Sequence, residues 1–347
     1  MNRRILLFVL ISFPLLQSCN AHRGEDELFR TKSKTSIERI SDTMSEYTSI
    51  VDLMGFEHYL VMIGLNLKSD TWVHVFDLDA KSFLLDAIPR GRGPGEMIHC
   101  SNVSMDGSGT FILTDRMKKV QVVFNLLELL TDGASSIREN KVDIPAFNVY
   151  SYQPDTSCYL YVQNPSEQAL SRSAISRFYV RSARSSDTLS VSDGYYYQDN
   201  ASNWAVYNYS QFASLGSRFV AGSTLGGLLE GYEVHDYTVK KLFAKEVFPV
   251  LLNRDGTFSS ACLWGFSDLY PETEGIWTIF DGEHSKDCDE PKFCNVALWD
   301  WSGVGLAAWK TEMELERICM IGRRMYSVVR SSDGQFFLAA LPEVHPL

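Results

Sequence analysis

The sequence predicts an all-β fold, a six-bladed β-propeller of four-stranded antiparallel blades. Two observations favour this fold. Short strand-like segments bounded by turn residues recur along the chain, and they group into units of roughly 50 residues, near the repeat length of known propellers. Radial closure also leaves only short sheet edges, whereas one long open sheet would expose its edge strands. Two β-sandwich domains are the alternative, and the recurring unit argues against them.

The first unit covers residues 59–96. An apolar run at 59–65, an alternating run at 71–77 and a third run at 83–88 predict three short strands. A Gly/Pro-rich segment follows them. This order is typical of an antiparallel meander, and we interpret the unit as the first blade.

The second unit, residues 105–126, begins with an Asp-Gly turn. An apolar strand is expected at 111–114, followed by Asp115, a basic loop and a second strand at 120–124. This succession resembles the repeat of propellers related to the NHL and TolB families. The resemblance implies that the unit is a second blade.

Four further units have the same plan. Their strand-like segments lie within residues 158–191, 218–248, 275–311 and 324–341. Together with the first two units they predict six blades. The mature chain has no convincing amphipathic helix pattern, and its best candidate, residues 311–318, is short.

Residues 1–18 predict a lipoprotein signal peptide. A basic pair, Arg3 and Arg4, precedes the apolar residues 5–16, a run too short to span a bilayer core of roughly 30 Å. The next segment, residues 16–19 (LQSC), resembles a bacterial lipobox, which makes Cys19 the expected lipidation site. An ordinary cleaved signal with an incidental cysteine is the alternative.

The signal peptide sets the expected domains and location. We expect a tether at 19–45 and the propeller at 46–347, with residues 36–40 as a candidate extra strand. The resemblance implies an outer membrane lipoprotein of a Gram-negative-type envelope, attached to the membrane through its lipid anchor. It leaves open whether the protein faces the periplasm or the cell surface.

Composition narrows the range of partners and covalent links. A net charge of −11 without a concentrated basic face argues against a nucleic-acid partner. Cys288 and Cys294 are near enough in sequence for a local disulfide in an oxidising compartment. For the other cysteines after Cys19 we favour buried free thiols; they are Cys100, Cys158, Cys262 and Cys319.

The sharpest local motif is IPRGRGPGEM at residues 88–97. It resembles the G-x-G-P-G-E segment of a family of TolB-like six-bladed propeller lipoproteins. Arg90, Arg92 and Glu96 either bind an anionic or polar ligand at the channel mouth, or belong to a sharp turn in which Glu96 accepts backbone N–H bonds. Asp115 and Arg116, at a strand end near the expected channel, have the same two interpretations.

Other polar and aromatic clusters favour structural roles. The acidic loop at 281–290 lacks the spacing of a zinc site or an EF-hand, so neither a metal nor a cofactor is expected. Aromatic residues gather at 195–197, at 204–209, and at Trp299 and Trp301. We expect them to form core between blades, with sugar or protein contact as the alternative.

Function follows only coarsely from these patterns. The chain has no G-x-S-x-G, H-E-x-x-H or Walker motif, and its histidines are scattered. We therefore expect a binding or scaffold module that presents a propeller face to a protein, peptide or glycan. The alternative is an enzyme with its site in the channel, similar to metal-dependent lactonases or sugar lyases.

Overall fold

The structure is a computed structural model of the whole chain. It describes residues 28–42, 44–142, 149–152, 158–163, 177–182, 188–193, 210–249, 251, 259–282 and 295–344. Cys19 lies outside these residues, as do Cys288 and Cys294 and the aromatic clusters at 195–197 and 204–209. The lipidation and the disulfide therefore stay predictions.

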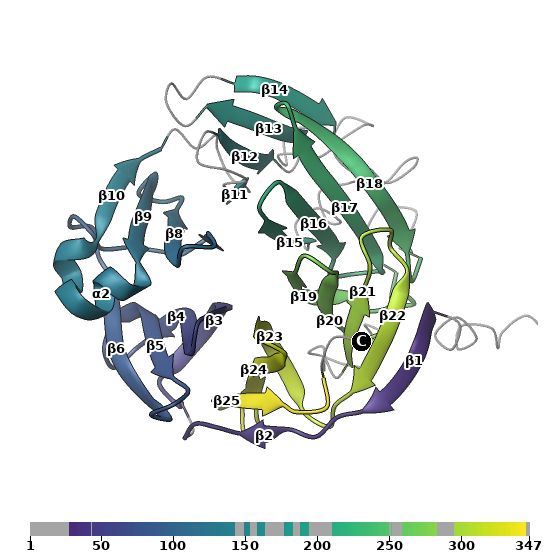
Figure 1. Cartoon of the computed structure of the whole chain (residues 1–347), viewed down its shortest axis with the longest axis horizontal. Coiled ribbons are helices and arrows are strands. Elements are labelled where there is room, and N and C mark those ends of the chain that lie inside the picture. Colours follow the sequence, from purple (N-terminus) through teal and green to yellow (C-terminus); the bar gives the residue numbers. More distant parts are fainter. Residues whose placement is uncertain are drawn as a thin grey trace, which may run out of the picture.

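The described strands form six sheets arranged around a central opening, as in a β-propeller (Figure 1). Five sheets have four strands, and these strands are all antiparallel. The sixth has a fifth strand, β1, which pairs in parallel with β22. The predicted four-stranded antiparallel blade is therefore correct for five sheets and incomplete for one.

We number the blades in chain order. Blade 1 contains β3 (Tyr47–Phe56), β4 (Tyr59–Asn66), β5 (Thr71–Asp77) and β6 (Ser82–Pro89). Blade 2 contains β7 (Asn102–Met105), β8 (Thr110–Asp115), β9 (Val120–Asn125) and β10 (Arg138–Lys141). Blade 3 contains β11 (Val149–Tyr152), β12 (Cys158–Gln163), β13 (Arg177–Ser182) and β14 (Thr188–Asp193).

The second half of the ring follows the same order. Blade 4 contains β15 (Ser210–Leu215), β16 (Arg218–Ser223), β17 (Leu228–His235) and β18 (Thr238–Glu246). Blade 5 contains β19 (Phe266–Pro271), β20 (Ile276–Phe280), β21 (Asn295–Trp299), β22 (Gly305–Lys310) and the added β1 (Phe29–Lys34). Blade 6 contains β23 (Glu314–Ile321), β24 (Arg324–Arg330), β25 (Phe336–Leu341) and β2 (Glu38–Arg39).

The innermost strands close the ring. Each of β3, β7, β11, β15, β19 and β23 contacts the innermost strand of the next blade, and β23 contacts β3. Apolar side chains fill the space between neighbouring blades. One core cluster joins blades 1 and 2 and another joins blades 5 and 6. The innermost strands therefore line the channel and also contribute side chains to the apolar core between the blades.

Part of the predicted tether belongs to the propeller. β2 pairs with β25 and completes blade 6, so residues near the start of the fold close the ring beside its C-terminal strand. β1 covers the edge of blade 5, where Phe29 packs on Trp299 with ring centroids 4.8 Å apart. The expected boundary at residue 46 is wrong because backbone pairing holds the polar β1 segment, whose other side chains are exposed.

Residues 311–318, the best of the unconvincing helix candidates, form a loop and the first part of β23. A short helix that the sequence patterns did not indicate, α2 (Leu126–Asp132), leads from β9 towards β10. Asn125 caps it by accepting hydrogen bonds from the backbone N–H groups of Leu127 and Glu128. Within the described residues, no helix has the length and apolar character needed to cross a membrane.

Buried cysteines and tryptophans behave largely as expected. Cys100, Cys262 and Cys319 are buried free thiols. Trp299 is fully buried and donates its indole N–H to Thr278 Oγ1 over 3.1 Å. Trp301 is only partly buried, because it lies in the turn after β21, and it donates to the Glu272 carbonyl oxygen.

Candidate functional site in the central channel

Two connected cavities occupy the central channel. The deep cavity, of about 150 Å³, is lined by residues of β3, β7, β15, β19 and β23. The mouth cavity, of about 450 Å³, lies where the connection between blades 1 and 2 reaches the channel. Both cavities are lined by Val51, Ser101, Gln211 and Arg317. These shared residues mark the passage from the mouth to the interior.

Three charged side chains line the deep cavity among the described residues: Asp52, Asp268 and Arg317. Each follows a β-bulge on an innermost strand. The extra residues are Val51 in β3, Ser267 in β19 and Glu316 in β23, and none of them has a partner in the neighbouring strand. A bulge rotates the residues that follow it, so it re-aims side chains at that point of the strand.

Asp268 and Arg317 connect three neighbouring blades. The Asp268 Oδ2 atom accepts a hydrogen bond from the backbone N–H of Ile318 over 2.8 Å, joining blade 5 to blade 6. The Arg317 Nε group donates to the Val51 carbonyl oxygen over 2.7 Å, joining blade 6 to blade 1. The same Nε lies 4.0 Å from Asp268 Oδ1, which makes a loose ion pair.

Asp52 completes the charged group. Its Oδ1 atom accepts from the backbone N–H of Leu53. Removal from water, reinforced by the nearby Asp268 carboxylate, raises the pKa of Asp52 to about 7, against the opposing pull of Arg317. Removal from water also raises the pKa of Asp268 to about 6. Near neutral pH the pair therefore holds a proton that ordinary aspartates would have lost.

Asn102 adds an acceptor without a partner. This residue, at the start of β7, lines the deep cavity and is 8% exposed. Its Oδ1 atom has no hydrogen-bond partner among the described residues. A buried polar atom left unpaired costs about 1–3 kcal/mol, so such atoms in native proteins call for an explanation. Among the described residues that line the deep cavity, Asn102 is the one with such an unpaired buried side-chain atom.

The mouth cavity is basic and polar. Arg90, His99 and Arg317 line it, together with Ser49, Ser101 and Gln211. The Arg90 Nε group pairs with Asp70 Oδ1 over 3.0 Å, and about half of each side chain is exposed. Trp72 forms part of the wall and donates its indole N–H to the Met97 carbonyl oxygen.

The predicted GRGPGE motif forms a tight turn that leads from blade 1 into blade 2. Glu96 accepts a hydrogen bond from the backbone N–H of Gly93 over 2.6 Å, as one of the two interpretations expected. Its carboxylate lies over Gly91, where a Cβ atom would come within 2.0 Å of Oε2. Glycine is therefore required at Gly91 while Glu96 keeps this position.

Asp115 is also engaged by the backbone. It is fully buried, its Oδ2 atom accepts from the N–H groups of Ile98 and His99, and its Oδ1 atom accepts from those of Met117 and Lys118. These bonds hold the connection between blades 1 and 2 against the β8–β9 turn. A structural role accounts for the position of Asp115.

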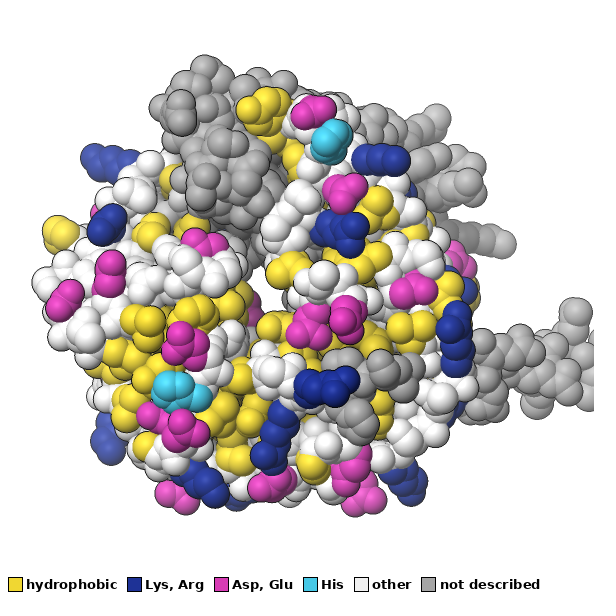
Figure 2. All heavy atoms as spheres, in the orientation of Figure 1, with side chains coloured by type: hydrophobic (Ala, Val, Ile, Leu, Met, Phe, Trp, Pro, Cys, Tyr) yellow, Lys and Arg dark blue, Asp and Glu magenta, His cyan; other side chains and the backbone are white. Residues whose placement is uncertain are grey.

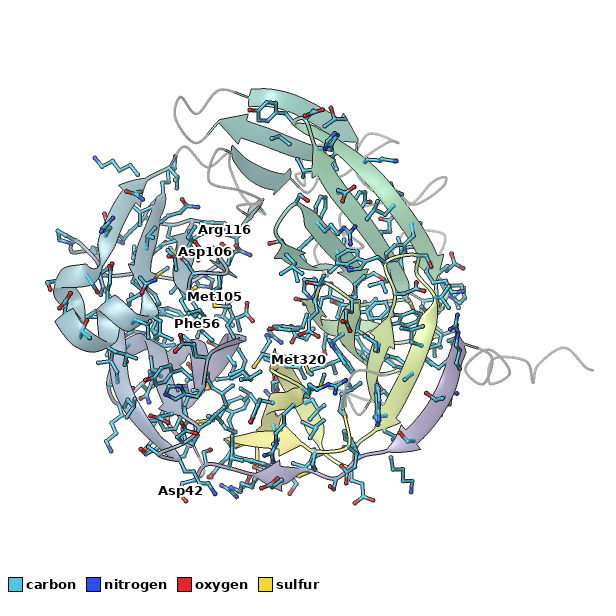
Figure 3. The ribbon with its side chains drawn as sticks, in the orientation of Figure 1. Asp42, Phe56, Met105, Asp106, Arg116 and Met320 are labelled. Carbon is cyan, nitrogen blue, oxygen red and sulfur yellow. The ribbon has the colours of Figure 1, made fainter. Side chains whose placement is uncertain are left out.

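Of the five residues predicted from sequence, the structure brings one to the channel cavities, namely Arg90. Arg92 is exposed on the GRGPGE turn. Arg116 is partly buried in the β8–β9 turn, where its backbone N–H donates to Ser101 Oγ (Figure 3). A ligand role for these residues stays a prediction.

Two other polar groupings lie away from the channel. A larger cavity of about 910 Å³ separates the β2 segment from blade 1, and its walls carry charges of both signs. His58, Asp77 and Asp79 place one ligand atom each within 4.8 Å of one another at two turns of blade 1. Neither grouping has an unpaired buried polar atom among its described residues, so we regard the channel as the stronger site despite its smaller volume.

Sequence reasoning missed Asp52, Asp268, Arg317 and Asn102. Each lies on an innermost strand, and the sequence patterns identified none of these strands. One signal was present for the two aspartates: a lone acidic residue lies inside each of the otherwise largely apolar segments IVDLM and GFSDLY. A charge within an apolar strand is rare unless it is paired or lines a cavity.

Comparisons with known proteins identify the fold. No family model matches the chain, and no curated protein matches its sequence. Among solved structures, a proposed exported protein from Bacteroides fragilis is 11% identical with a TM-score of 0.58, and the alignment covers 91% of this chain and 99% of that chain.

Two further structures are less similar. The β-propeller domain of Cps50 (Swd1) from Myceliophteria thermophila is 12% identical with a TM-score of 0.49, covering 88% of this chain and 99% of that chain. The calcium-binding protein regucalcin from Agrobacterium tumefaciens is 11% identical with a TM-score of 0.48, covering 91% and 98%. At such low identity, structural likeness carries nothing about activity.

Proposed function

We propose that this protein is a binding protein that takes a small polar ligand, or one polar side chain of a partner, in its central channel. The observation that carries the proposal is the unpaired Asn102 Oδ1 in a cavity that Asp52 and Asp268 also line. A few convergent polar groups in a partly apolar cavity are typical of binding sites.

The two mouths of the channel carry different charged residues, so the channel has two distinguishable ends. Arg90, His99 and Arg317 make one mouth basic. The opposite mouth is formed by the turns that follow the innermost strands, and the described turns carry Glu57, Asp106, Glu272 and Glu274 against Arg323. A ligand with separated charges would enter such a channel in one orientation.

The setting we infer for this binding protein is the cell envelope. Residues 1–19 support a lipoprotein signal with Cys19 as the lipidated residue, and the GRGPGE segment supports membership of the TolB-like six-bladed lipoproteins. In cells, Cys19→Ala should move the protein from the membrane fraction to the soluble fraction. Continued retention of the variant in the membrane fraction would count against the lipid anchor.

Ligand binding can be tested by blocking the channel. Gln211 lines both cavities, so Gln211→Trp should fill the passage between them. We expect the wild-type protein to gain thermal stability with at least one member of a panel of amines, amino acids, short peptides and sugars. The gain should be absent in Gln211→Trp and retained in Thr238→Trp, a control on the exposed start of β18. An unchanged gain in Gln211→Trp would refute channel binding.

An enzyme is the second candidate, and one observation favours it. Two carboxyl groups with raised pKa values in one cavity are what general acid–base catalysis uses. If the protein is a hydrolase or lyase of this kind, Asp52→Asn and Asp268→Asn should each abolish turnover of a substrate found by screening. Turnover that survives both substitutions would exclude this mechanism.

A further inference from the structure

We propose that the deep cavity binds the primary ammonium group of an aliphatic amine, with Asp52 and Asp268 as its anionic partners. This inference rests on the proposed function and specifies the class of ligand. Three independent features of the cavity support it: its charge balance, its hydrogen-bonding groups and its walls.

The charge balance fits one monovalent cation. Asp52, Asp268 and Arg317 are the charged groups lining the cavity within the described part of the chain. In the empty cavity near neutral pH the two carboxyls hold one proton, and binding of a cation that releases this proton leaves one negative charge that Arg317 does not compensate. An ammonium group neutralises this charge, whereas a divalent cation would leave an excess positive charge beside Arg317. Burial makes such an imbalance costly.

The hydrogen-bonding groups favour a donor. Asn102 Oδ1 has no partner, and Asp268 Oδ1 meets Arg317 Nε only at 4.0 Å. Asp52 adds a further carboxylate, of which Oδ1 already accepts from the Leu53 N–H. At the charged group the cavity thus offers weakly engaged acceptors, while its donors on Ser101, Ser104 and Gln211 lie on other parts of the lining strands. An ammonium group carries three N–H donors and no acceptor, which matches this arrangement.

The walls favour an aliphatic stem. Beyond the charged group, towards the ends of the innermost strands, the cavity is lined by Met54, Met105, Leu215 and Pro271. Met105, labelled in Figure 3, ends β7 beside the central opening. Methionine and leucine side chains suit a flexible alkyl chain. The ammonium group would then lie at Asp52 and Asp268, with its methylene groups against the apolar wall.

The surface at this mouth attracts cations. Acidic side chains lie beside the central opening on the face shown in Figure 2. The turns after β3, β7 and β19 supply acids to this mouth, whereas the cavity at the other mouth is lined by Arg90, which is paired with Asp70. Such a field raises the local concentration of a cationic ligand and sets the end from which it enters.

The same ammonium chemistry has two sources, a free polyamine or the side chain of lysine in a partner peptide. Calorimetric titration of the full chain can separate them. The probes are n-butylamine, spermidine and a blocked Gly-Lys-Gly peptide, with n-butanol and the Nε-acetylated peptide as uncharged counterparts. Spermidine binding without peptide binding would identify a free amine, and the reverse would identify a lysine side chain.

We expect the amines to bind and the uncharged counterparts not to bind. Asp52→Asn and Asp268→Asn should each weaken amine binding by about tenfold or more, because each removes a charged hydrogen-bond partner. Asn102→Ala should weaken amine binding by less than the aspartate substitutions do. This variant tests the site if an aspartate variant fails to fold. Asp236→Asn, in an exposed outer turn, should leave affinity unchanged.

Other outcomes would overturn the inference. Amine binding that is unaffected by all three cavity variants would place the amine elsewhere. Calcium binding that depends on Asp52, without amine binding, would identify a metal site instead. If sugars or anions bind in a manner sensitive to Gln211→Trp while amines do not, the ligand class is wrong but channel binding stands. If no ligand of any class binds, the proposed function fails as well.

Discussion

The Asp268 carboxylate and the Arg317 guanidinium lie next to each other on the neighbouring innermost strands β19 and β23, with Oδ1 and Nε 4.0 Å apart. Both residues follow a bulge in an innermost strand, and both also bind the backbone of a neighbouring blade. The pair therefore has two consequences. It holds the inner ring together, and it places opposite charges inside the cavity where a ligand is expected.

Arg317→Met should destabilise the protein more at pH 8 than at pH 5. The substitution leaves Asp52 and Asp268 without their cation, and a broken buried pair costs about 3–5 kcal/mol. At pH 5 both carboxyls are protonated, because their pKa values are raised, so the loss should be smaller. Urea unfolding followed by tryptophan fluorescence measures both values.

Arg218→Met is the matched control for this measurement. Arg218 pairs with Glu233 in blade 4, where over a third of its side chain is exposed. Its loss should cost below about 1 kcal/mol. Equal destabilisation of Arg317→Met at the two pH values would contradict the coupling of Arg317 to the two aspartates.

Asp52→Asn should stabilise the protein at neutral and alkaline pH. The pKa of Asp52 is raised from 3.8 to about 7 on folding, so ionisation favours the unfolded state and wild-type stability falls as pH rises through this range. The asparagine variant has no carboxyl group at this position, so its stability does not fall with pH for this reason. Its advantage should be absent near pH 4 and reach on the order of 2–4 kcal/mol at pH 8. A pH-independent difference would show that Asp52 ionises normally.

The sequence patterns located the outer strands and missed the inner ones. The predicted strand at 71–77 coincides with β5. The strand predicted at 59–65 is one residue shorter than β4 at its end, and that at 83–88 is one residue shorter than β6 at each end. None of the innermost strands was predicted. Outer strands pack between blades and read as apolar runs, whereas innermost strands face a polar channel and carry bulges that disrupt alternation. The site was missed for the same reason, since its residues lie on those strands.

The link between His74 and Asp86 predicts an acid-dependent loss of stability. His74 is fully buried, and its Nδ1 lies 2.7 Å from Asp86 Oδ1 while its Nε2 lies 3.0 Å from the Gly64 carbonyl oxygen. The hydrogen bond with His74 lowers the pKa of Asp86 below 3.8. The stability that this hydrogen bond adds to the folded protein is therefore fully present above pH 3.8. It is lost as the pH falls through the lowered pKa of Asp86.

Comparison of Asp86→Ala with wild type tests this link. The variant should be less stable by about 1 kcal/mol or less at pH 5 to 7, because Asp86 is 42% exposed and solvent screens the interaction. The difference in melting temperature should shrink as pH falls below 3.8. A difference that grows on acidification would have the wrong sign.

Lys118 should control the rigidity of the GRGPGE turn. Its Nζ donates to the carbonyl oxygens of Gly93 and Glu96 over 2.8 and 2.7 Å and to Glu139 Oε2 over 2.9 Å. Lys118→Met removes all three bonds; the Gly93 carbonyl oxygen and Glu139 Oε2 keep one backbone N–H donor each, so we expect a loss of about 2 kcal/mol, mainly from the Glu96 carbonyl oxygen. Amide hydrogen exchange at residues 91–98 should accelerate. Lys240→Met, on the exposed face of β18, should leave exchange in this turn unchanged.

Ring closure by the N-terminal segment gives the last prediction. A chain that starts at Glu46, the domain boundary expected from sequence, loses β2 and leaves the edge of β25 unpaired. It also loses the bonds from Thr35 and Ser36 to the Glu343 carboxylate. Because an open edge strand recruits other chains, this protein should melt at a lower temperature and aggregate.

A chain that starts at Thr35 separates the roles of the two added strands. It keeps β2 and the Glu343 bonds but loses β1, which only covers an edge of blade 5. Since β2 joins the start of the fold to its final strand, we expect this chain to stay monomeric and to melt well above the chain that starts at Glu46. Calorimetry and light scattering measure the two effects. Equal melting temperatures for the two shortened chains would mean that β2 does not close the ring.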